Sequence, residues 1–178
     1  MDYLNEFSLT EKQKKQFEVY FSYLVQENEK INLTALTSKE DVYVKHFYDS
    51  LLLANQFDFS KDITLCDVGS GAGFPSIPLK IAFPNIQVTI IEPTQKRIAF
   101  LSRLLQLLEI DDIKLLPERA EDVAVQYLEK FDLVTARAVA RLNILVELCM
   151  PFVKIKGTLI AMKGALYAEE MKEAKNAI

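Results

Sequence analysis

The sequence is poor in the side chains that build metal centres and disulfide frameworks. It has one histidine, His46, and two cysteines, Cys66 and Cys149, in 178 residues. A single histidine excludes a Cys/His cluster with zinc spacing and leaves no Ser-His-Asp candidate set. Both cysteines lie in apolar segments, which favours buried free thiols in a reducing compartment. We therefore expect no metal ligands in this chain.

The sequence also lacks the hydrophobic segments of a membrane or secreted protein. No apolar run approaches the ~18 residues that a membrane-spanning helix needs, and the charged N-terminus has no apolar signal core. The formal net charge is −4, which argues against a protein that holds nucleic acid by its overall charge but leaves room for a local basic patch. We expect a cytoplasmic monomer that does not bind membranes.

The spacing of the apolar residues changes character near residue 60. Before it, helical spacing predicts a helix over 8–31, opened by a capping box of Ser8 and Glu11, and a second helix over 39–57. After it, short β-type runs alternate with helical ones. Strands are predicted over 63–68, 86–92, 112–117, 131–136 and 158–163, and helices over 94–110, 119–130, 142–152 and 165–178.

This alternation predicts an α/β fold with a parallel, doubly wound sheet, because parallel strands need crossovers and helices then cover both sheet faces. We expect residues 1–60 to form a small N-terminal helical cap and residues 61–178 to form the α/β domain. The chain stops in the helix that follows the fifth predicted strand.

Three of the five glycines stand at alternate positions in the stretch CDVGSGAGFPSIPL, residues 66–79. They are Gly69, Gly71 and Gly73, and they follow the first predicted strand. Glycine is required where φ is positive or where a ligand contacts the backbone, and open α/β sheets bind ligands at this strand end. A dinucleotide loop would place its third glycine at residue 74, where this chain has Phe74. The stretch favours another ligand, although a tight strand–helix turn would use the same glycines.

Two carboxylates flank this loop. Asp67 precedes the glycines, and a carboxylate there would repel a pyrophosphate but attract an ammonium or sulfonium group. Glu92 closes the second predicted strand, where a carboxylate can accept hydrogen bonds from both ribose hydroxyls of a cofactor; a solvated strand end is the alternative. The order Asp67-x-Gly69-x-Gly71-x-Gly73 resembles motif I of the class I methyltransferases that use S-adenosylmethionine (SAM).

Further segments extend the resemblance over residues 15–164. They occur in the order INLTALTSKEDVYVKHFYDSLLL (31–53), DVGSGAGFPSIPLKI (67–81), KRIAFL (96–101), RAE (119–121) and TARAVA (135–140). Together they closely resemble the GidB (RsmG) family. The resemblance implies a Rossmann-like class I fold and a bacterial enzyme that uses SAM to methylate a guanine N7 of 16S ribosomal RNA. Its partner would be this RNA or the small ribosomal subunit.

The resemblance also assigns roles to residues. SAM contacts would come from Gly69, Phe74, Glu92, Ala120 and Glu121. Among them, Glu92 would hold the ribose, and Ala120 and Glu121 would flank the adenine. Two features depart from the family pattern. Ser76 replaces the glycine expected after Phe-Pro, and the two strands that class I enzymes usually add after the fifth strand and its helix are absent.

Arg137 is the expected catalytic residue, and the resemblance also places it beside the cofactor. Guanine N7 has a lone pair and no proton to lose, so alignment rather than a general base can supply most of the acceleration. The segment Thr135-Ala-Arg137-Ala-Val-Ala-Arg141 lacks the Asn-Pro-Pro-Tyr, Asp-Pro-Pro-Tyr and Pro-Cys signatures of other methyltransferases. An arginine here could stack on a flipped guanine or donate to its O6 and N7. The alternative is an arginine bound to a carbonyl or carboxylate.

RNA binding must come from a local patch, because the net charge is negative. The candidates lie in segments expected near the ligand edge: Lys45, His46, Lys96, Arg97, Arg141 and Lys163. Solvated surface charge is the alternative for each cation, and a hydrogen-bonded packing residue is the alternative for His46. Since N7 faces the narrow major groove of an RNA helix, an exposed loop or a partly folded subunit is the expected target.

Three other functions remain compatible with the sequence. A related methyltransferase could act on a small molecule or a protein, and methylation of 16S RNA would separate the two. An NAD-dependent oxidoreductase would bind nicotinamide, against which Phe74 argues. A non-catalytic module would bind SAM or RNA without turnover, which becomes relevant if the two absent strands are needed.

Overall fold

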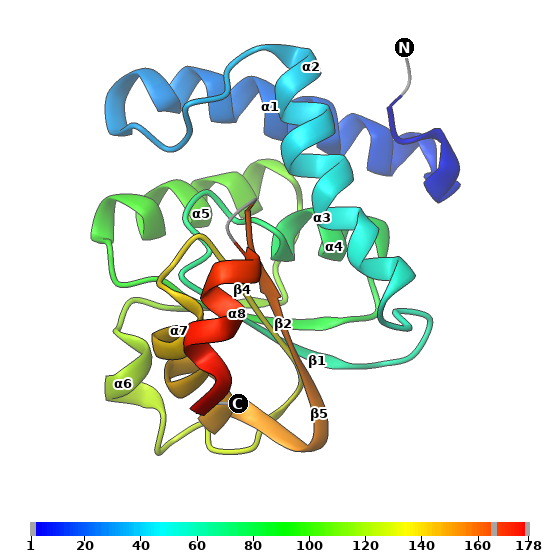
Figure 1. Ribbon diagram of the computed structural model, residues 1–178. Helices are drawn as coiled ribbons and strands as arrows, with labels where there is room; N and C mark the ends of the chain where they lie inside the picture. The colour runs from blue at the N-terminus through cyan, green and yellow to red at the C-terminus, as the bar shows by residue number, and fades with distance from the viewer. Residues whose placement is uncertain (1–2, 165–166, 177–178) are drawn as a thin grey trace.

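The computed structural model describes residues 3–164 and 167–176, and helices cover both faces of one sheet (Figure 1). In this part of the chain the sheet has five strands in the spatial order β3-β2-β1-β4-β5, and every neighbouring pair is parallel. The predicted parallel α/β sheet is thus confirmed. The chain proceeds outward from β1 in both directions, so the carboxyl ends of β1, β2 and β4 form the expected ligand edge.

Four strands lie close to their predicted ranges. The bounds are β1 Thr64–Val68, β2 Gln87–Ile91, β3 Ile113–Leu116, β4 Phe131–Arg137 and β5 Val153–Met162. β5 begins at Val153 rather than at residue 158. Its first part is polar and irregular, with φ of 69° at Lys156 and a register shift against β4, which explains why the sequence pattern missed it.

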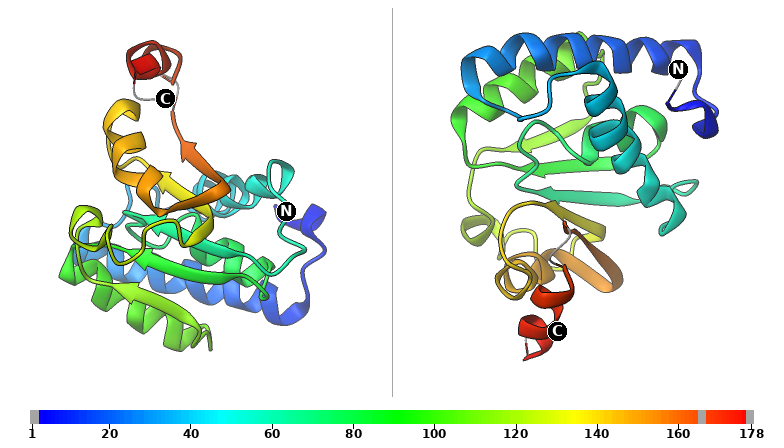
Figure 2. Two further views of the ribbon diagram at one scale, coloured as in Figure 1. Left: turned by 90° about the horizontal axis from the view of Figure 1, so that it is seen from below. Right: turned by 45° about the horizontal axis from the view of Figure 1, so that its top comes forward.

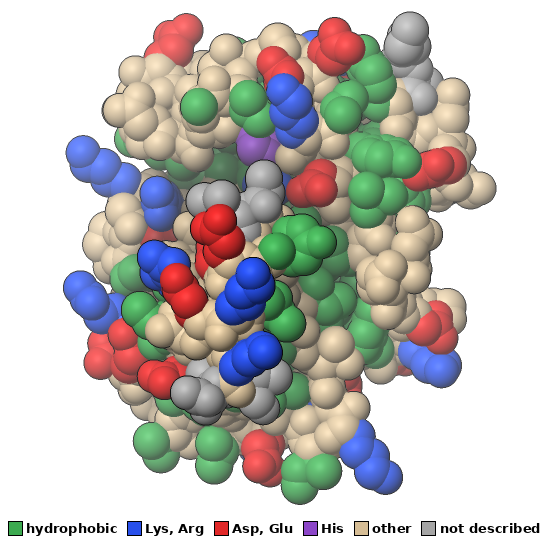
Figure 3. Space-filling model, viewed as in Figure 1, with side chains coloured by type: hydrophobic (Ala, Val, Ile, Leu, Met, Phe, Trp, Pro, Cys, Tyr) green, Lys and Arg blue, Asp and Glu red, His purple; other side chains and the backbone are tan. Residues whose placement is uncertain are grey.

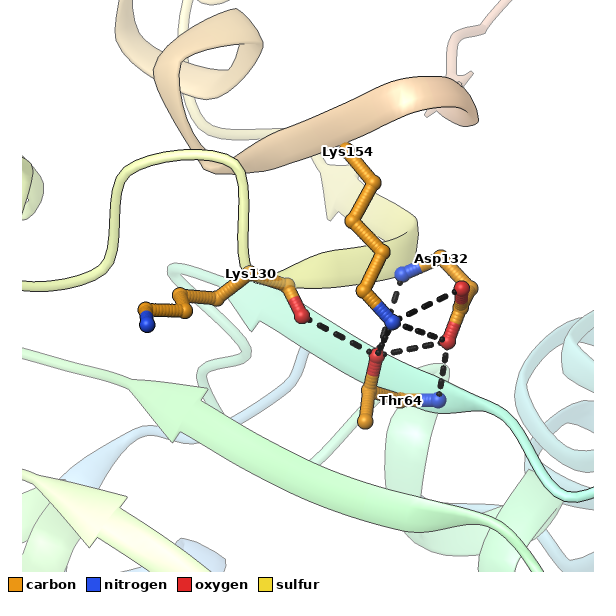
Figure 4. Close-up of polar contacts among 4 residues, drawn as sticks. All are labelled: Thr64, Lys130, Asp132 and Lys154. Atoms are coloured by element: carbon orange, nitrogen blue, oxygen red, sulfur yellow. Dashed lines mark hydrogen bonds and ion pairs between the residues drawn. The ribbon is translucent and has the colours of Figure 1, made fainter.

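A polar cluster anchors this early start of β5. Figure 4 shows Lys154 reaching across to Asp132 and Thr64 at the amino ends of β4 and β1. Lys154 Nζ donates to both carboxylate oxygens of Asp132 at 2.9 and 3.0 Å, and Thr64 Oγ1 donates to Asp132 at 2.7 Å. The cluster lies at the opposite end of the strands from the glycine loop, so its role is to hold the strands together.

Helices lie on both faces of the sheet, as the two views of Figure 2 show from different sides, and an apolar layer fills the space on each face. The first layer contains Leu65 of β1 and lies under α1 (Glu11–Ile31), α4 (Ser76–Ala82) and α5 (Gln95–Leu107). The second contains Cys66 of β1 and lies under α6 (Ala120–Val123) and α7 (Leu142–Cys149). Because successive strand residues point to opposite faces, neighbouring apolar residues of β1 fill both layers.

The prediction of buried free thiols is confirmed, since Cys66 and Cys149 are both buried and free. Burial raises the pKa of the Cys149 thiol to about 12 and raises that of Cys66 as well. Neither thiol is therefore a nucleophile at neutral pH. None of the described helices has the length and apolar character that crossing a membrane requires.

The first long helix begins later than predicted and with a different cap. Thr10 and Gln13 form the capping box: Gln13 N–H donates to Thr10 Oγ1 at 3.3 Å, and Thr10 N–H donates to Gln13 Oε1 at 2.8 Å. The predicted box of Ser8 and Glu11 is wrong. Ser8 has φ of 49° and ends a short 3-10 helix over Asn5–Phe7, so it lacks the extended backbone that an N-cap needs.

The second predicted helix is confirmed as a helical run over residues 39–55 whose middle is widened. It consists of α2 (Lys39–Val42), a π-helical segment (Tyr43–Tyr48), α3 (Asp49–Leu51) and a 3-10 turn (Leu52–Asn55). π-helical turns occur frequently at functional sites because they re-aim side chains. Here the widened turn carries His46.

Two later helices differ from their predictions. The helix expected over 119–130 is reduced to α6, because Val125 and Leu128 are 88% and 56% exposed and find no apolar layer to pack on. The helix expected over 165–178 appears as α8 (Tyr167–Glu173) followed by a 3-10 turn (Ala174–Asn176). Residues 165–166 and 177–178 of that prediction lie outside the described residues. A further 3-10 turn, Met150–Phe152, joins α7 to β5.

Candidate active site

The three glycines between β1 and α4 all have positive φ: 69° at Gly69, 62° at Gly71 and 100° at Gly73. A Cβ at Gly69 would lie 2.7 Å from Cγ2 of Val139, and one at Gly73 would lie 2.6 Å from Cδ1 of Ile77. A Cβ at Gly71 would meet no atom within 4 Å. Gly69 and Gly73 therefore permit close packing, whereas Gly71 faces open space in which a ligand can contact the backbone.

Glu92 follows β2 and turns its carboxylate onto this loop. Oε2 accepts a hydrogen bond from Gly71 N–H at 3.1 Å, and Oε1 accepts one from Thr94 N–H at 2.9 Å. Arg97 adds an ion pair at 3.4 Å, and Glu92 is 1% exposed. The structure thus brings Glu92 to the one glycine of the loop that faces open space.

Asp67 lies behind the glycine loop and is fully buried. Its Oδ2 accepts hydrogen bonds from the hydroxyl and the N–H of Ser76, and its Oδ1 accepts one from Thr135 Oγ1 at 3.1 Å. Burial raises the pKa of this carboxyl to about 7, although these hydrogen bonds and Arg137 act to lower it. The carboxylate of Asp67 therefore has partners within the protein, and its contact with a ligand cation stays a prediction. Its carboxylate joins β1 to β4 and to the first turn of α4, and Ser76 is its partner.

The ring of Phe74 is also buried, at 3% exposure. It stacks on Tyr20 of α1 with 5.3 Å between ring centroids, and on His46 with 4.6 Å. The Arg137 guanidinium lies 4.8 Å from the ring centroid. The aromatic side chain therefore supports the loop from the N-terminal helices. Only the backbone of Phe74 remains as the expected cofactor contact.

Arg137 is the last residue of β4 and is 19% exposed. One terminal nitrogen lies 3.2 Å from His46 Nδ1, and the other lies 3.6 Å from Asp49 Oδ2. Burial lowers the pKa of the guanidinium, and the nearby Asp49 carboxylate raises it; the group stays charged at neutral pH. The alternative to a catalytic role was an arginine that only binds a carboxylate. The structure shows such a contact for Arg137, and it also places Arg137 on the wall of a cleft.

The cleft has a volume of about 1030 Å³ and lies between the helical run over 39–55 and the ends of β4 and β5. Its lining includes Lys45, His46, Asp49, Arg137, Arg141 and Lys163. Four of the six predicted RNA-binding residues therefore share one cleft with the predicted catalytic arginine. The other two, Lys96 and Arg97, lie in the first turn of α5 and do not line it.

The cations of this cleft are already paired with acidic side chains. The pairs are Lys45–Asp41, Arg141–Glu173 and Lys163–Glu170. Figure 3 shows basic and acidic side chains intermixed over the face that carries α8, rather than a continuous basic surface. The predicted local patch is thus a cluster of ion pairs on this face, and RNA phosphates would have to exchange partners with carboxylates to bind there.

Ala120 and Glu121 begin α6, which follows the end of β3 after a three-residue loop. Ala120 is 8% exposed and packs in the second apolar layer, whereas Glu121 is exposed. The Glu92 N–H donates to Leu116 O at 3.1 Å, which keeps the ends of β2 and β3 side by side. This arrangement leaves Ala120 and Glu121 at the same edge of the sheet as Glu92.

The chain matches the family model of GidB, described as rRNA small subunit methyltransferase G, over residues 13–178. The chain belongs to this family. A ribosomal RNA small subunit methyltransferase G of Bacillus cereus is 54% identical over 173 residues, which cover 96% of this chain and 72% of the relative. The family predicted from the quoted motifs is therefore confirmed, and with it a SAM-dependent rRNA methyltransferase.

Comparison with solved structures supports the fold. A precorrin-6y methyltransferase of Geobacter metallireducens superposes with a TM-score of 0.56 at 17% identity, covering 80% of this chain and 71% of that one. A Corynebacterium glutamicum protein superposes with a TM-score of 0.62 at 14% identity, covering 98% and 82%. At such identities the likeness concerns the fold alone, which is the predicted Rossmann-like class I methyltransferase fold.

The residues present fit SAM. Gly71 leaves open space beside its backbone, and the Glu92 carboxylate stands at the end of the neighbouring strand. The Ser70 hydroxyl is buried and has no hydrogen-bond partner among the described residues. A buried polar atom without a partner costs free energy unless a ligand or water satisfies it. The family's cofactor therefore meets a loop with an open glycine, an unsatisfied hydroxyl and a buried carboxylate at the end of β2.

Two residues around Arg137 were not predicted from the sequence. Asp49 and Thr34 both lie in the segment 31–53 that carries the most specific part of the family resemblance. Asp49 pairs with Arg137, and Thr34 hydrogen-bonds His46 at 2.8 Å. The available signal was helical spacing, since Asp49 stands one turn after His46 on the same run.

Substitutions at two of the glycines separate the roles of the loop. Gly73→Ala is expected to lower the free energy of unfolding by about 2 kcal/mol or more, because it combines positive φ with a clash against Ile77. Gly71→Ala should cost only about 1 kcal/mol of stability, from its backbone angle. Its methyl group would enter the open space, so SAM affinity should fall at least tenfold. Chemical unfolding and calorimetric titration with SAM would check both; undiminished affinity in Gly71→Ala would contradict the assignment.

Proposed function

We propose that this chain transfers a methyl group from SAM to the N7 of a guanine in 16S ribosomal RNA, acting as a monomer on the RNA or on the small ribosomal subunit. The observation that carries the proposal is the position of Arg137. Its guanidinium stands on the wall of the large cleft, next to the glycine loop and fixed by two side chains. A planar, always charged donor at that place suits the O6 and N7 acceptors of guanine.

The cofactor would be held by the loop and by the ends of the neighbouring strands. Gly69, Gly71 and the backbone of Phe74 would line its methionine part, and Glu92 would turn from Gly71 N–H to the ribose hydroxyls. Ala120 and Glu121 would flank the adenine. Asp67 and Gly73 would act indirectly, by holding the shape of the loop.

The chemistry asks for alignment rather than acid–base catalysis. The N7 lone pair takes the methyl group that SAM supplies, and no proton has to leave. Arg137 would orient the flipped base by donating to its O6, so that N7 points toward the cofactor. The groups next to Arg137 are consistent with this, because both ring nitrogens of the neutral His46 have partners and the Asp49 carboxylate is paired with Arg137 itself.

The RNA would approach over the cleft. Lys45, Arg141 and Lys163 would exchange their carboxylate partners for phosphates, while Lys96 and Arg97 would contact a more distant part of the RNA. In this proposal residues 1–60 act as a cap that supports the loop and residues 61–178 carry the catalytic domain. Salt-dependent RNA affinity should follow from such contacts.

The test combines binding and turnover. Calorimetric titration with SAM, its demethylated product and NAD should show binding of the first two but not of NAD. Incubation with labelled SAM and either naked 16S RNA or small subunits from cells lacking this methylation should then label the RNA, with 7-methylguanosine found after digestion. SAM binding without RNA labelling would favour a non-catalytic module. Labelling of another base, or of protein, would replace the proposed substrate.

A further inference from the structure

His46, the single histidine of the chain, connects the N-terminal segments to Arg137. Its Nε2 lies 2.8 Å from Thr34 Oγ1 in the loop after α1, and its Nδ1 lies 3.2 Å from a terminal nitrogen of Arg137. The imidazole also stacks on Phe74 with an angle of 22° between the rings. Both nitrogens and one face of the ring therefore have contacts within the protein.

These contacts determine the tautomer. A guanidinium can only donate hydrogen bonds, so the Nδ1 that faces Arg137 must carry a lone pair and no hydrogen. The single ring proton of the neutral imidazole then sits on Nε2, and Thr34 Oγ1 accepts it. The same Thr34 oxygen also accepts from Leu36 N–H at 3.0 Å, which fixes the hydroxyl on the loop.

The contacts also determine where the guanidinium of Arg137 lies. His46 Nδ1 accepts from one terminal nitrogen, the Asp49 carboxylate faces the other at 3.6 Å, and the guanidinium carbon Cζ lies 4.8 Å from the centroid of the Phe74 ring. Asp49 alone would leave a long and partly exposed ion pair, which restrains a side chain weakly. The hydrogen bond from Arg137 to His46 is directional and closer than the ion pair, and it supplies the restraint that the ion pair lacks.

We propose that His46 is a positioning residue that orients Arg137 through a neutral, Nε2-protonated imidazole, and that it is not an RNA ligand. The effect of His46 on catalysis rests on the proposed function, but the hydrogen bond between His46 and Arg137 does not. The proposal replaces the prediction that His46 contacts RNA, since a ring with both nitrogens engaged has no donor left for a phosphate.

The electrostatic surroundings agree with this role. The charged groups around the ring are Arg137 from β4 and Asp41, Lys45 and Asp49 from its own helical run. Burial and the Arg137 charge lower the pKa of His46 to about 4, while a hydrogen bond with the Lys45 backbone and the Asp41 charge act in the opposite direction. The imidazole is thus neutral at neutral pH and can accept from an arginine, which a charged imidazolium could not.

Because the chain has one histidine, nitrogen NMR of the ring tests the contact without any activity. At pH 7 the wild-type spectrum should show protonated Nε2 and bare Nδ1. Arg137→Ala should give a mixture of tautomers and a higher pKa, whereas Thr34→Val should leave Nδ1 bare because Arg137 still donates to it. A protonated Nδ1 in the wild type, or an unchanged spectrum in Arg137→Ala, would overturn the proposal.

Three substitutions at His46 test the consequence for methylation. Asn places an oxygen where Nδ1 was, Gln places its amide where Nε2 was, and Lys offers a cation to phosphate. The proposal predicts that His46→Asn keeps kcat within about threefold, whereas Gln and Lys lower it on the order of tenfold or more through misplacement of Arg137. KM for RNA and the affinity for SAM should change little.

The outcomes separate this proposal from the proposed function. Lys45→Ala, the neighbouring cation, is the control for RNA contact and should act on KM alone. Retained or improved activity in His46→Lys, with loss in His46→Asn, would identify an RNA ligand and overturn the positioning role. A wild-type chain that methylates no RNA would refute the proposed function, while the tautomer measurement would still decide whether His46 holds Arg137.

Discussion

Replacing Arg137 with alanine is expected to lower kcat/KM for 16S RNA methylation on the order of 100-fold, with little change in SAM affinity. The reason is geometric. Methylation of N7 depends on alignment of base and methyl donor, and a base displaced by about 1 Å can lose two orders of magnitude in rate. Arg137 lies on the cleft wall, and His46 and Asp49 each contact one of its terminal nitrogens.

Lysine at this position should restore little of the activity. It keeps the charge but offers neither the planar fork for guanine nor a second nitrogen for His46 and Asp49. Arg103→Ala is the matched control, because it removes the same charge from an exposed arginine of α5 that donates to Gln106 Oε1 at 3.0 Å. Single-turnover rates with saturating SAM and RNA would make the comparison. Equal rates for Arg137→Ala and Arg103→Ala would remove Arg137 from the catalytic machinery.

Asp67→Asn is expected to change the pH dependence of stability by on the order of 4 kcal/mol between pH 4 and pH 8. Burial places the pKa of the folded carboxyl at about 7, against an ordinary value of 3.8. Between these values the folded state binds a proton that the unfolded state does not. The stability that this carboxyl contributes is therefore complete below its unfolded pKa and is lost as the pH rises through the folded pKa.

Asparagine does not titrate, so Asp67→Asn should gain stability relative to the wild type as the pH rises from 4 to 8. Chemical unfolding of both proteins at several pH values would measure this difference. The comparison of the two proteins is needed because His46 changes the pH dependence of stability in the opposite direction. Its folded pKa of about 4 lies below the ordinary 6.5, so its contribution grows with pH and partly masks Asp67 in the wild type.

Asp111→Asn makes the same change of carboxylate to amide on the exposed surface and controls for the loss of one charge. A constant stability difference between Asp67→Asn and the wild type at all pH values would show that Asp67 is ionised at neutral pH despite its burial. The hydrogen bonds from Ser76 and Thr135 would then outweigh the cost of burying the charge.

The sequence was most informative where function depends on residues close together in the chain. The glycines at 69, 71 and 73, the carboxylate at the end of β2 and the arginine at the end of β4 all stand where a strand meets a loop. Parallel strands bring such ends to one edge of the sheet, so the positions alone predicted that they would lie together. Their fold class followed from the alternation of strands and helices.

The sequence could not show which way these side chains face. Asp67 and Phe74 stand in the glycine motif, yet one is buried between β4 and α4 and the other is stacked between Tyr20 and His46. Likewise, the apolar pattern over 119–130 matches a helix, but Val125 and Leu128 find no layer to pack on. Periodicity describes one segment, whereas burial depends on which other segments are folded against it.

The sequence by itself therefore determined the family, the sheet with its ligand edge, and the residues expected to hold SAM. Only the tertiary structure decided how the arginine of β4 is held, because its partner His46 is separated from it by 91 positions in the chain. A histidine in a helical run carries no sign of its tautomer or its partner. In the folded chain the N-terminal helical run packs over the end of β4. His46 is there the acceptor that orients Arg137, and not the phosphate contact that its position in the sequence suggested.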